Sequence, residues 1–312
     1  MKLIRLNSFL YLFCILSVFA SCVQKPDSSV EDWNRTFINT KKLISEACLD
    51  RELILGRPFL IQYVDSSLLI YDDIGDSLFL LVDLKENDRV YRFGQKGEGN
   101  NEFLQVFAFC NMKSDSILGV YDAYKHELRE INLDKVKRGE MNFPVVFKDT
   151  LSSIKLSPTK YDAYLGLGFY ESNMLSLTDN SIGSKFFFEY PYKDSREKAI
   201  SNRLRGMAYQ GTLCSNRSLD KFLYAVCSAP IFMLFSVNKD GIEKTYELIG
   251  GYPNYVTEET GEYRSAPMSA DNKMSFTMAY ATDNYIYLLY SGKNFRDAGM
   301  DAVSYTHLTL PT

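Results

Sequence analysis

Histidine and tryptophan are almost missing from this chain of 312 residues, which contains two His and one Trp. The six Cys are scattered and show no Cys-x-x-Cys spacing. This scarcity argues against zinc sites and against histidine-dependent hydrolysis, because both need such side chains in clusters. The composition therefore favours a binding scaffold over an enzyme. We expect no catalytic residues, no metal and no cofactor.

An excess of positive charge is also missing. The 35 Lys and Arg stand against 39 Asp and Glu, a net charge of −4, so no basic field is left to hold a phosphate backbone. Nucleic acid is therefore not an expected partner. Aromatic residues are abundant, with 22 Tyr and 21 Phe, and their side chains suit the pleated surface of β-sheets.

The first 21 residues read as a signal peptide. Lys2 and Arg5 precede an apolar run that ends near Ala20, which is shorter than the roughly 20 apolar residues that a transmembrane helix needs. Phe19-Ala20-Ser21-Cys22 resembles a bacterial lipobox, in which the cysteine is acylated. Acyl chains on Cys22 would anchor the protein in the lipid bilayer. The alternative is an ordinary secretory peptide with a chance cysteine.

Residues 22–45 are polar at first and show no alternation, so they read as a tether. Val23 lacks the Asp that some bacteria use as an inner-membrane retention signal. We therefore expect a lipid-anchored protein of the cell envelope, on the outer membrane.

Four cysteines remain once Cys14 is removed and Cys22 is acylated: Cys48, Cys110, Cys214 and Cys227. Cys214 and Cys227 are the first candidates for a disulfide, since they lie on neighbouring predicted strands. The turn between their strands centres near Arg217-Ser218, which places Cys214 opposite Lys221 and Cys227 out of reach. The sequence predicts free thiols.

Short strands separated by turns follow one another from residue 46 onward, without a long helical period. The segment 65–72 recurs 50 residues later as 115–122, and each copy precedes a second strand. Related strands return near residues 164–177, 222–237 and 285–290. A period of about 50 to 60 residues with about four strands per unit is typical of β-propeller blades. We expect an all-β propeller over residues 46–302 whose axis is lined by the first strand of each blade, including Leu68–Tyr71 and Ile117–Tyr121.

Three parts of the chain carry a resemblance to a known family. The run Phe93–Phe103, the two Tyr-Asp strand ends and the segment Asp283–Gly292 resemble the TolB-like six-bladed propeller lipoproteins of gut-type Gram-negative bacteria. This chain has Gly-Asn-Asn-Glu-Phe at 99–103 where the family usually has Gly-Pro-Gly-Glu-Phe. The resemblance implies a six-bladed propeller and an envelope location, and it brings no catalytic set.

The last ten residues, 303–312, finish no blade and resemble translated sequencing-adapter tails. We therefore expect a non-native tail after Ala302 and an incomplete six-bladed propeller whose last blade is missing, with exposed strand edges. The alternative is a genuinely short protein.

Two features resemble functional sites, but each has a simpler structural explanation. The glycines at 94–99 follow a strand but open no helix, so they suit turns better than a nucleotide phosphate. His126 is the one histidine before the last ten residues, and we place it on a solvated strand rather than in a catalytic triad.

Carboxylates recur at strand ends, including Asp72 and Asp122. Turn capping explains them, because an Asp side chain accepts hydrogen bonds from nearby backbone N–H groups. The alternative is a propeller hydrolase or lyase acting on polysaccharide, with these two residues as acid and base.

Two long insertions interrupt the regular strands at 190–205 and 250–264, and loops of this length inside a compact domain are usually functional or disordered. Their Tyr rings and Arg side chains would suit a glycan or an envelope protein. The candidate binding residues are Tyr192, Arg203, Arg205, Tyr252 and Tyr255. The function that we expect is that of an envelope-anchored binding or scaffold module.

Overall fold

The computed structural model describes residues 42, 44, 53–86, 89–179, 183–260 and 263–297. The predicted signal peptide, Cys22, nearly all of the predicted tether, Cys48 and the tail 303–312 lie outside the described residues. Within the described ranges, no helix has the length and apolar character needed to cross a membrane.

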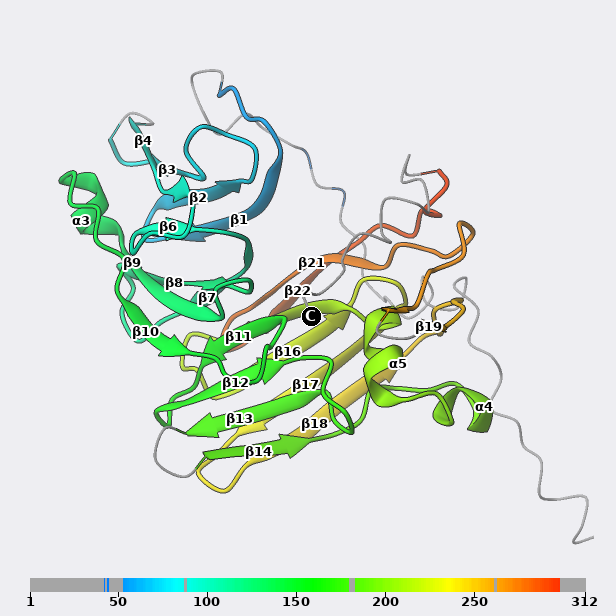
Figure 1. Ribbon diagram of the computed structural model, residues 1–312. Helices are drawn as coiled ribbons and strands as arrows, with labels where there is room; N and C mark the ends of the chain where they lie inside the picture. The colour runs from blue at the N-terminus through cyan, green and yellow to red at the C-terminus, as the bar shows by residue number, and fades with distance from the viewer. Residues whose placement is uncertain are drawn as a thin grey trace, which may run out of the picture. The chain divides into compact units, whose positions relative to one another are not determined.

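Four antiparallel sheets of four strands follow one another along the chain (Figure 1). The first contains β1 (Pro58–Val64), β2 (Ser67–Asp72), β3 (Phe79–Asp83) and β4 (Arg89–Phe93). The second contains β7 (Val106–Asn111), β8 (Ile117–Asp122), β9 (Glu127–Asn132) and β10 (Val145–Lys148). The third contains β11 (Lys155–Pro158), β12 (Ala163–Leu167), β13 (Leu175–Asp179) and β14 (Gly183–Phe187). The fourth contains β15 (Gly211–Ser215), β16 (Lys221–Val226), β17 (Ile231–Val237) and β18 (Ile242–Ile249).

Smaller elements complete the described chain. Two-stranded sheets are formed by β5 (Gln95–Lys96) with β6 (Glu102–Phe103), β19 (Glu258–Thr260) with β20 (Tyr263–Ser265), and β21 (Phe276–Ala281) with β22 (Ile286–Tyr290). The helices are α3 (Leu133–Lys137), α4 (Ser195–Lys198) and α5 (Asn202–Ala208). The fold is an incomplete six-bladed β-propeller, with four blades complete and two strands of a fifth among the described residues. This confirms the predicted fold class.

In the first, second and fourth blades an inner strand is buried on both faces. All five residues of β3 are buried, as are the last five of β8 and of β16. Sheets that pack between neighbours lose the apolar–polar alternation of a half-exposed strand. Aromatic rings fill the space between the first two blades, where the Phe79 and Phe103 centroids lie 4.9 Å apart at 77°. Full burial of such a side chain stabilises the fold by about 1.5–3 kcal/mol.

First strands lie at the axis, as predicted, but the two segments that the repeat assigned to them do not. The first strand of each blade contacts the first strand of the next: β1 with β7, β7 with β11, β11 with β15, and β15 with β21. Leu68–Tyr71 and Ile117–Tyr121 lie instead in the second strands β2 and β8. The prediction was wrong because the conspicuous apolar repeat belongs to strands buried on both faces. We call the sheet ends at which these first strands begin the leading face.

The described cysteines Cys110, Cys214 and Cys227 are free, as predicted. Cys214 pairs with Leu223 rather than Lys221, because the turn between β15 and β16 centres one residue later than predicted. Burial raises the pKa of Cys214 to about 12, so this thiol stays protonated at neutral pH.

Candidate functional site

The two long insertions precede the first strands β15 and β21, so both lie on the leading face. We call residues 190–210, 250–260 and 263–272 together the loop platform. The first insertion is helical rather than irregular, because both of its helices are capped. The Asp194 carboxylate accepts hydrogen bonds from the N–H groups of Arg196 (2.9 Å) and Glu197 (3.0 Å) at the start of α4. Ser201 caps α5 in the same way.

Helix α5 is fixed against the third blade. The Asn202 side chain accepts a hydrogen bond from Tyr190 N (2.8 Å) and donates to the carbonyl oxygens of Tyr170 (3.0 Å) and Asn173 (2.8 Å). A Cβ atom on Gly206 would lie 2.5 Å from Cε2 of Tyr190, so this close approach needs glycine. The platform is therefore held in place before any ligand binds.

Glu197 holds Tyr209, and Tyr209 joins the two insertions. Its carboxylate accepts hydrogen bonds from the Tyr209 hydroxyl (2.8 Å) and from the backbone N–H of Lys193. The Tyr209 ring meets the Tyr255 ring edge-on, with centroids 6.3 Å apart at 83°. Burial first, and the Glu197 charge after it, raises the pKa of both tyrosines, so these phenols remain protonated.

Arg205 and Tyr192 form the most distinctive contact of the platform. The Arg205 side chain is only 2% exposed, and its Nη2 donates to Oε2 of Glu189 (2.9 Å). Its Cζ lies 5.2 Å from the Tyr192 ring centroid, and Nζ of Lys198 lies 5.1 Å from the same centroid. Nε and Nη1 of Arg205 have no hydrogen-bond partner among the described residues. The Tyr192 ring, 37% exposed, is thus a surface aromatic with two cations beside it.

Of the five predicted binding residues, four lie on this assembly. Tyr192 contacts Arg205, while Tyr252 and Tyr255 pack against the apolar cluster that contains Tyr209. Arg203 is two positions from Arg205 on α5 and so projects from another face; within the described ranges no contact joins it to the other four. The sequence reasoning missed Glu197, although Asp194-x-x-Glu197 is a capping pattern that could have located it.

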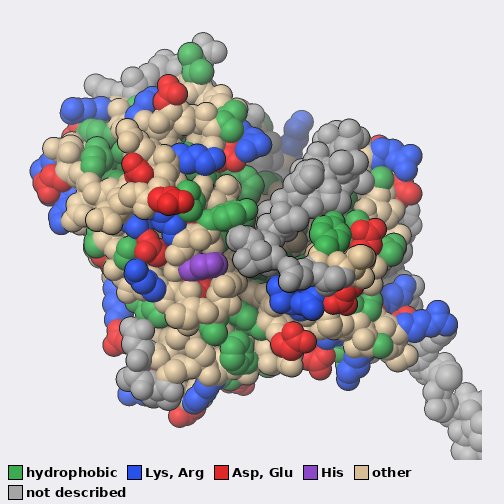
Figure 2. All heavy atoms as spheres, viewed as in Figure 1, with side chains coloured by type: hydrophobic (Ala, Val, Ile, Leu, Met, Phe, Trp, Pro, Cys, Tyr) green, Lys and Arg blue, Asp and Glu red, His purple; other side chains and the backbone are tan. Residues whose placement is uncertain are grey.

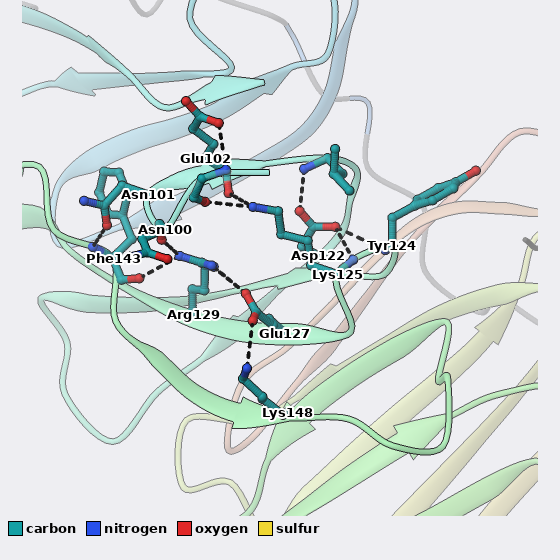
Figure 3. Close-up of polar contacts among 12 residues, drawn as sticks. Asn100, Asn101, Glu102, Asp122, Tyr124, Lys125, Glu127, Arg129, Phe143 and Lys148 are labelled. Atoms are coloured by element: carbon teal, nitrogen blue, oxygen red, sulfur yellow. Dashed lines mark hydrogen bonds and ion pairs between the residues drawn. The ribbon is translucent and has the colours of Figure 1, made fainter. Parts of the chain in front are cut away.

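The glycine-rich segment serves as a connection between blades (Figure 3). Lys125 Nζ donates to the carbonyl oxygens of Gly99 (2.9 Å) and Glu102 (2.8 Å). The Asn101 side chain accepts a hydrogen bond from Phe143 N (3.1 Å). The segment continues into β6 and β7 rather than a helix. These contacts suit a structural turn and give a phosphate no helix N-terminus.

His126 does not lie on a strand, contrary to the prediction. It occupies the turn between β8 and β9 with φ of 54°, a left-handed conformation that the sequence pattern did not reveal. Its carbonyl oxygen accepts a hydrogen bond from Asp149 N (2.8 Å), which ties the turn to the start of the next blade.

The strand-end carboxylates bind backbone N–H groups. Asp72 is buried and accepts hydrogen bonds from Gly56 N (2.6 Å) and Arg57 N (2.7 Å), just before β1. Asp122 accepts from Leu104 N (2.6 Å) before β7, and caps its own turn through Tyr124 N (3.1 Å). Burial acts to raise the pKa of Asp72, but these N–H groups outweigh it and hold the pKa below 3.8. The predicted capping role is therefore confirmed. In the first two blades these carboxylates also bind the segment that leads into the first strand.

Charge is mixed on the face that Figure 2 shows, with acidic and basic side chains interspersed. Within the described ranges, no three His, Cys, Asp or Glu side chains gather so as to hold a metal ion.

The comparisons with known proteins agree with this architecture. A family model described as TolB-like 6-blade propeller-like matches residues 36–306. The chain belongs to this TolB-like propeller family. None of the curated proteins matches it.

Solved structures that resemble the chain include a protein described as exported, from Bacteroides fragilis, with 13% identity and a TM-score of 0.39 over 70% of this chain and 82% of that one. A protein of unknown function from Bacteroides thetaiotaomicron has 10% identity and a TM-score of 0.43 over 73% of this chain and 55% of that one. The β-propeller domain of Cps50 from Myceliophteria thermophila has 12% identity and a TM-score of 0.36 over 77% and 88%.

Replacing Asp72 by Asn should lower the free energy of unfolding at pH 7 by about 1–3 kcal/mol, because the N–H groups of Gly56 and Arg57 then face a poorer acceptor. The neighbouring Asp73 pairs with Arg57, whose side chain is largely exposed, so Asp73→Asn should cost less than about 1 kcal/mol. Urea unfolding measures both.

The pH dependence provides a second check. The folded pKa of Asp72 is depressed, so its contribution is present above pH 3.8 and is lost as the pH falls through the folded pKa. The difference between wild type and Asp72→Asn should shrink over that range. Equal losses for Asp72→Asn and Asp73→Asn at pH 7 would contradict the capping role.

Proposed function

We propose that this protein is an exported lipoprotein, anchored in the cell envelope through acylated Cys22, whose propeller is a non-catalytic module that binds a glycan. The loop platform is its recognition surface. The observation that carries this proposal is the Tyr192 ring, which is accessible to solvent while Arg205 and Lys198 lie beside it.

Sugar rings present apolar faces that pack on aromatic rings, and the exposed ammonium group of Lys198 can donate hydrogen bonds to their oxygen atoms. The buried Arg205 supports the Tyr192 ring from below the surface. The caps of α4 and α5 and the contacts of Asn202 hold the platform in one conformation, which lowers the entropy cost of binding. An envelope protein is the other ligand class that these residues would suit, and the binding experiment below distinguishes the two.

A catalytic role for Asp72 and Asp122 receives no support from their contacts. Both carboxylates accept hydrogen bonds from backbone N–H groups, and the pKa of Asp72 is lowered. A general acid for glycoside cleavage needs a carboxyl whose pKa is raised. These two residues therefore fit the structural role better than that of an acid and base pair.

Anchoring rests on the leader, in which a short apolar run ends at Phe19-Ala20-Ser21-Cys22. Two or three acyl chains hold a protein stably in a membrane, since each buried CH₂ contributes about 0.8 kcal/mol. The residue after the cysteine is Val23, which supports the outer membrane as the destination.

Cys22→Ala should move the protein from the membrane pellet to the soluble fraction after cell fractionation, because no acyl chains can be attached. Cys14→Ala is the matched control, since Cys14 lies inside the apolar run, and this variant should stay in the pellet. A Cys22→Ala protein that remains in the pellet would show that the lipoprotein assignment is wrong.

A screen of envelope and dietary glycans, run beside envelope proteins and a turnover assay, should give saturable glycan binding without product. Tyr192→Ala should weaken that binding at least about tenfold, because it removes the accessible ring. Tyr285→Ala is the control: Tyr285 is 68% exposed but lies in the turn between β21 and β22, at the opposite end of the sheets.

Three outcomes would contradict the proposal: binding that is restricted to proteins, equal losses in Tyr192→Ala and Tyr285→Ala, or turnover of a glycan that Asp72→Asn abolishes.

A further inference from the structure

A lysine near the propeller axis has no acidic partner. Lys155 is the first residue of β11, so it lies at the leading face. Its Nζ donates a hydrogen bond to the carbonyl oxygen of Phe107 on β7 and lies 5.7 Å from the centroid of the Phe107 ring. Among the described residues, no carboxylate forms an ion pair with Lys155.

The strands around Lys155 explain this isolation. β7, β12 and β15, which flank β11, contain no Asp, Glu, Lys, Arg or His. The one charged residue of β8 is Asp122, whose carboxylate is bound to backbone N–H groups. The titratable group whose charge acts on Lys155 is the Cys227 thiol, directly after β16.

Burial is costly for such an amine. It lowers the pKa of Lys155 from 10.5 to about 8 and outweighs the Cys227 thiol, which acts to raise that pKa. At pH 7 the amine is still mostly protonated. An ammonium group has three N–H donors, and the Phe107 carbonyl accepts from one of them. Lys155 is partly exposed, so a ligand can reach it, and charges in such partly desolvated surroundings are normally paired. A negative charge placed beside Lys155 would therefore be stabilised.

One aromatic ring, that of Phe107, lies next to this amine at the leading face, and a second ring packs against Phe107. The half-buried Phe107 ring meets the Tyr124 ring edge-on, with centroids 6.2 Å apart at 79°. Tyr124 belongs to the turn between β8 and β9 and is 42% exposed. Its ring points away from the Asp122 carboxylate that binds its backbone N–H (Figure 3).

We propose that Lys155, Phe107 and Tyr124 form a second binding site, separate from the loop platform, for a sugar that bears a carboxylate. The carboxylate pairs with the ammonium group, and the apolar face of the sugar packs on the aromatic pair. A single ammonium group matches the single charge of a carboxylate better than the double charge of a phosphate. These residues belong to β7, β11 and the β8–β9 turn, so the site does not depend on the platform.

The probes are galacturonate and galactose, which differ by the carboxylate, and binding is measured by calorimetry on the full chain. Galacturonate should bind the wild type at pH 7, and Lys155→Met should weaken this at least tenfold, because Met keeps the apolar stem and removes the charge. Lys148→Met is the control, since the Lys148 side chain is 76% exposed on β10. Galactose should bind weakly to all three proteins.

An NMR titration of Lys155 in the wild-type protein tests the same site, and it does not depend on whether Lys155→Met folds. Lysine labelled with ¹⁵N at Nζ reports the pKa of Lys155 by NMR. Galacturonate should raise that pKa from about 8 towards 10.5, and galactose should not. Affinity for galacturonate should accordingly be greatest below pH 8 and fall as the pH rises through 8, because the amine loses its proton.

The proposal is overturned if Lys155 titrates at the same pH with and without galacturonate, or if folded Lys155→Met binds it as wild type does. The Tyr192→Ala variant distinguishes binding at the loop platform from binding at the Lys155 site. It should weaken binding at the platform and leave the effect of galacturonate on Lys155 unchanged.

Discussion

The Tyr-Asp pair that ends the second strand holds neighbouring blades together. In the first two blades the aspartate accepts hydrogen bonds from the N–H groups that lead into its own first strand. The tyrosine reaches the next blade: Tyr71 accepts a hydrogen bond from Val106 N (3.4 Å), and Tyr121 donates to Asp149 (2.8 Å). Leaving one such buried group unsatisfied costs about 1–3 kcal/mol. One dipeptide therefore fixes both the start of a blade and the contact to its neighbour.

This arrangement limits where the proposed recognition could occur. All of these contacts lie at the leading face, and they use the carboxylates that would otherwise be the obvious candidates for catalysis. The side chains left to contact a ligand at the leading face are those of the inserted loops and of the first strands near the axis. Arg205 and Tyr192 illustrate the former and Lys155 the latter, and in both cases a cation lies beside an aromatic ring. A rigid scaffold that carries binding residues on its loops is a common division of labour in proteins.

The repeat of short strands was visible in the sequence, because strands such as β2 and β8 are buried on both faces and stay apolar throughout. Their position within the blade was not visible, since periodicity reports burial and not the order of strands around an axis. Tyr192 and Arg205 could be named as candidates because loop length and residue type distinguish them, and their binding role stays a prediction. The isolation of Lys155 could not, because it depends on the uncharged strands that tertiary packing brings around β11.

Hydrogen–deuterium exchange on the full chain, with and without a glycan that it binds, tests the central claim that recognition takes place on the leading face. The account predicts slower exchange for amides of residues 190–210 and 250–260, and no change in the turns 112–116 and 216–220 at the opposite end of the sheets. Protection confined to those opposite turns would contradict it.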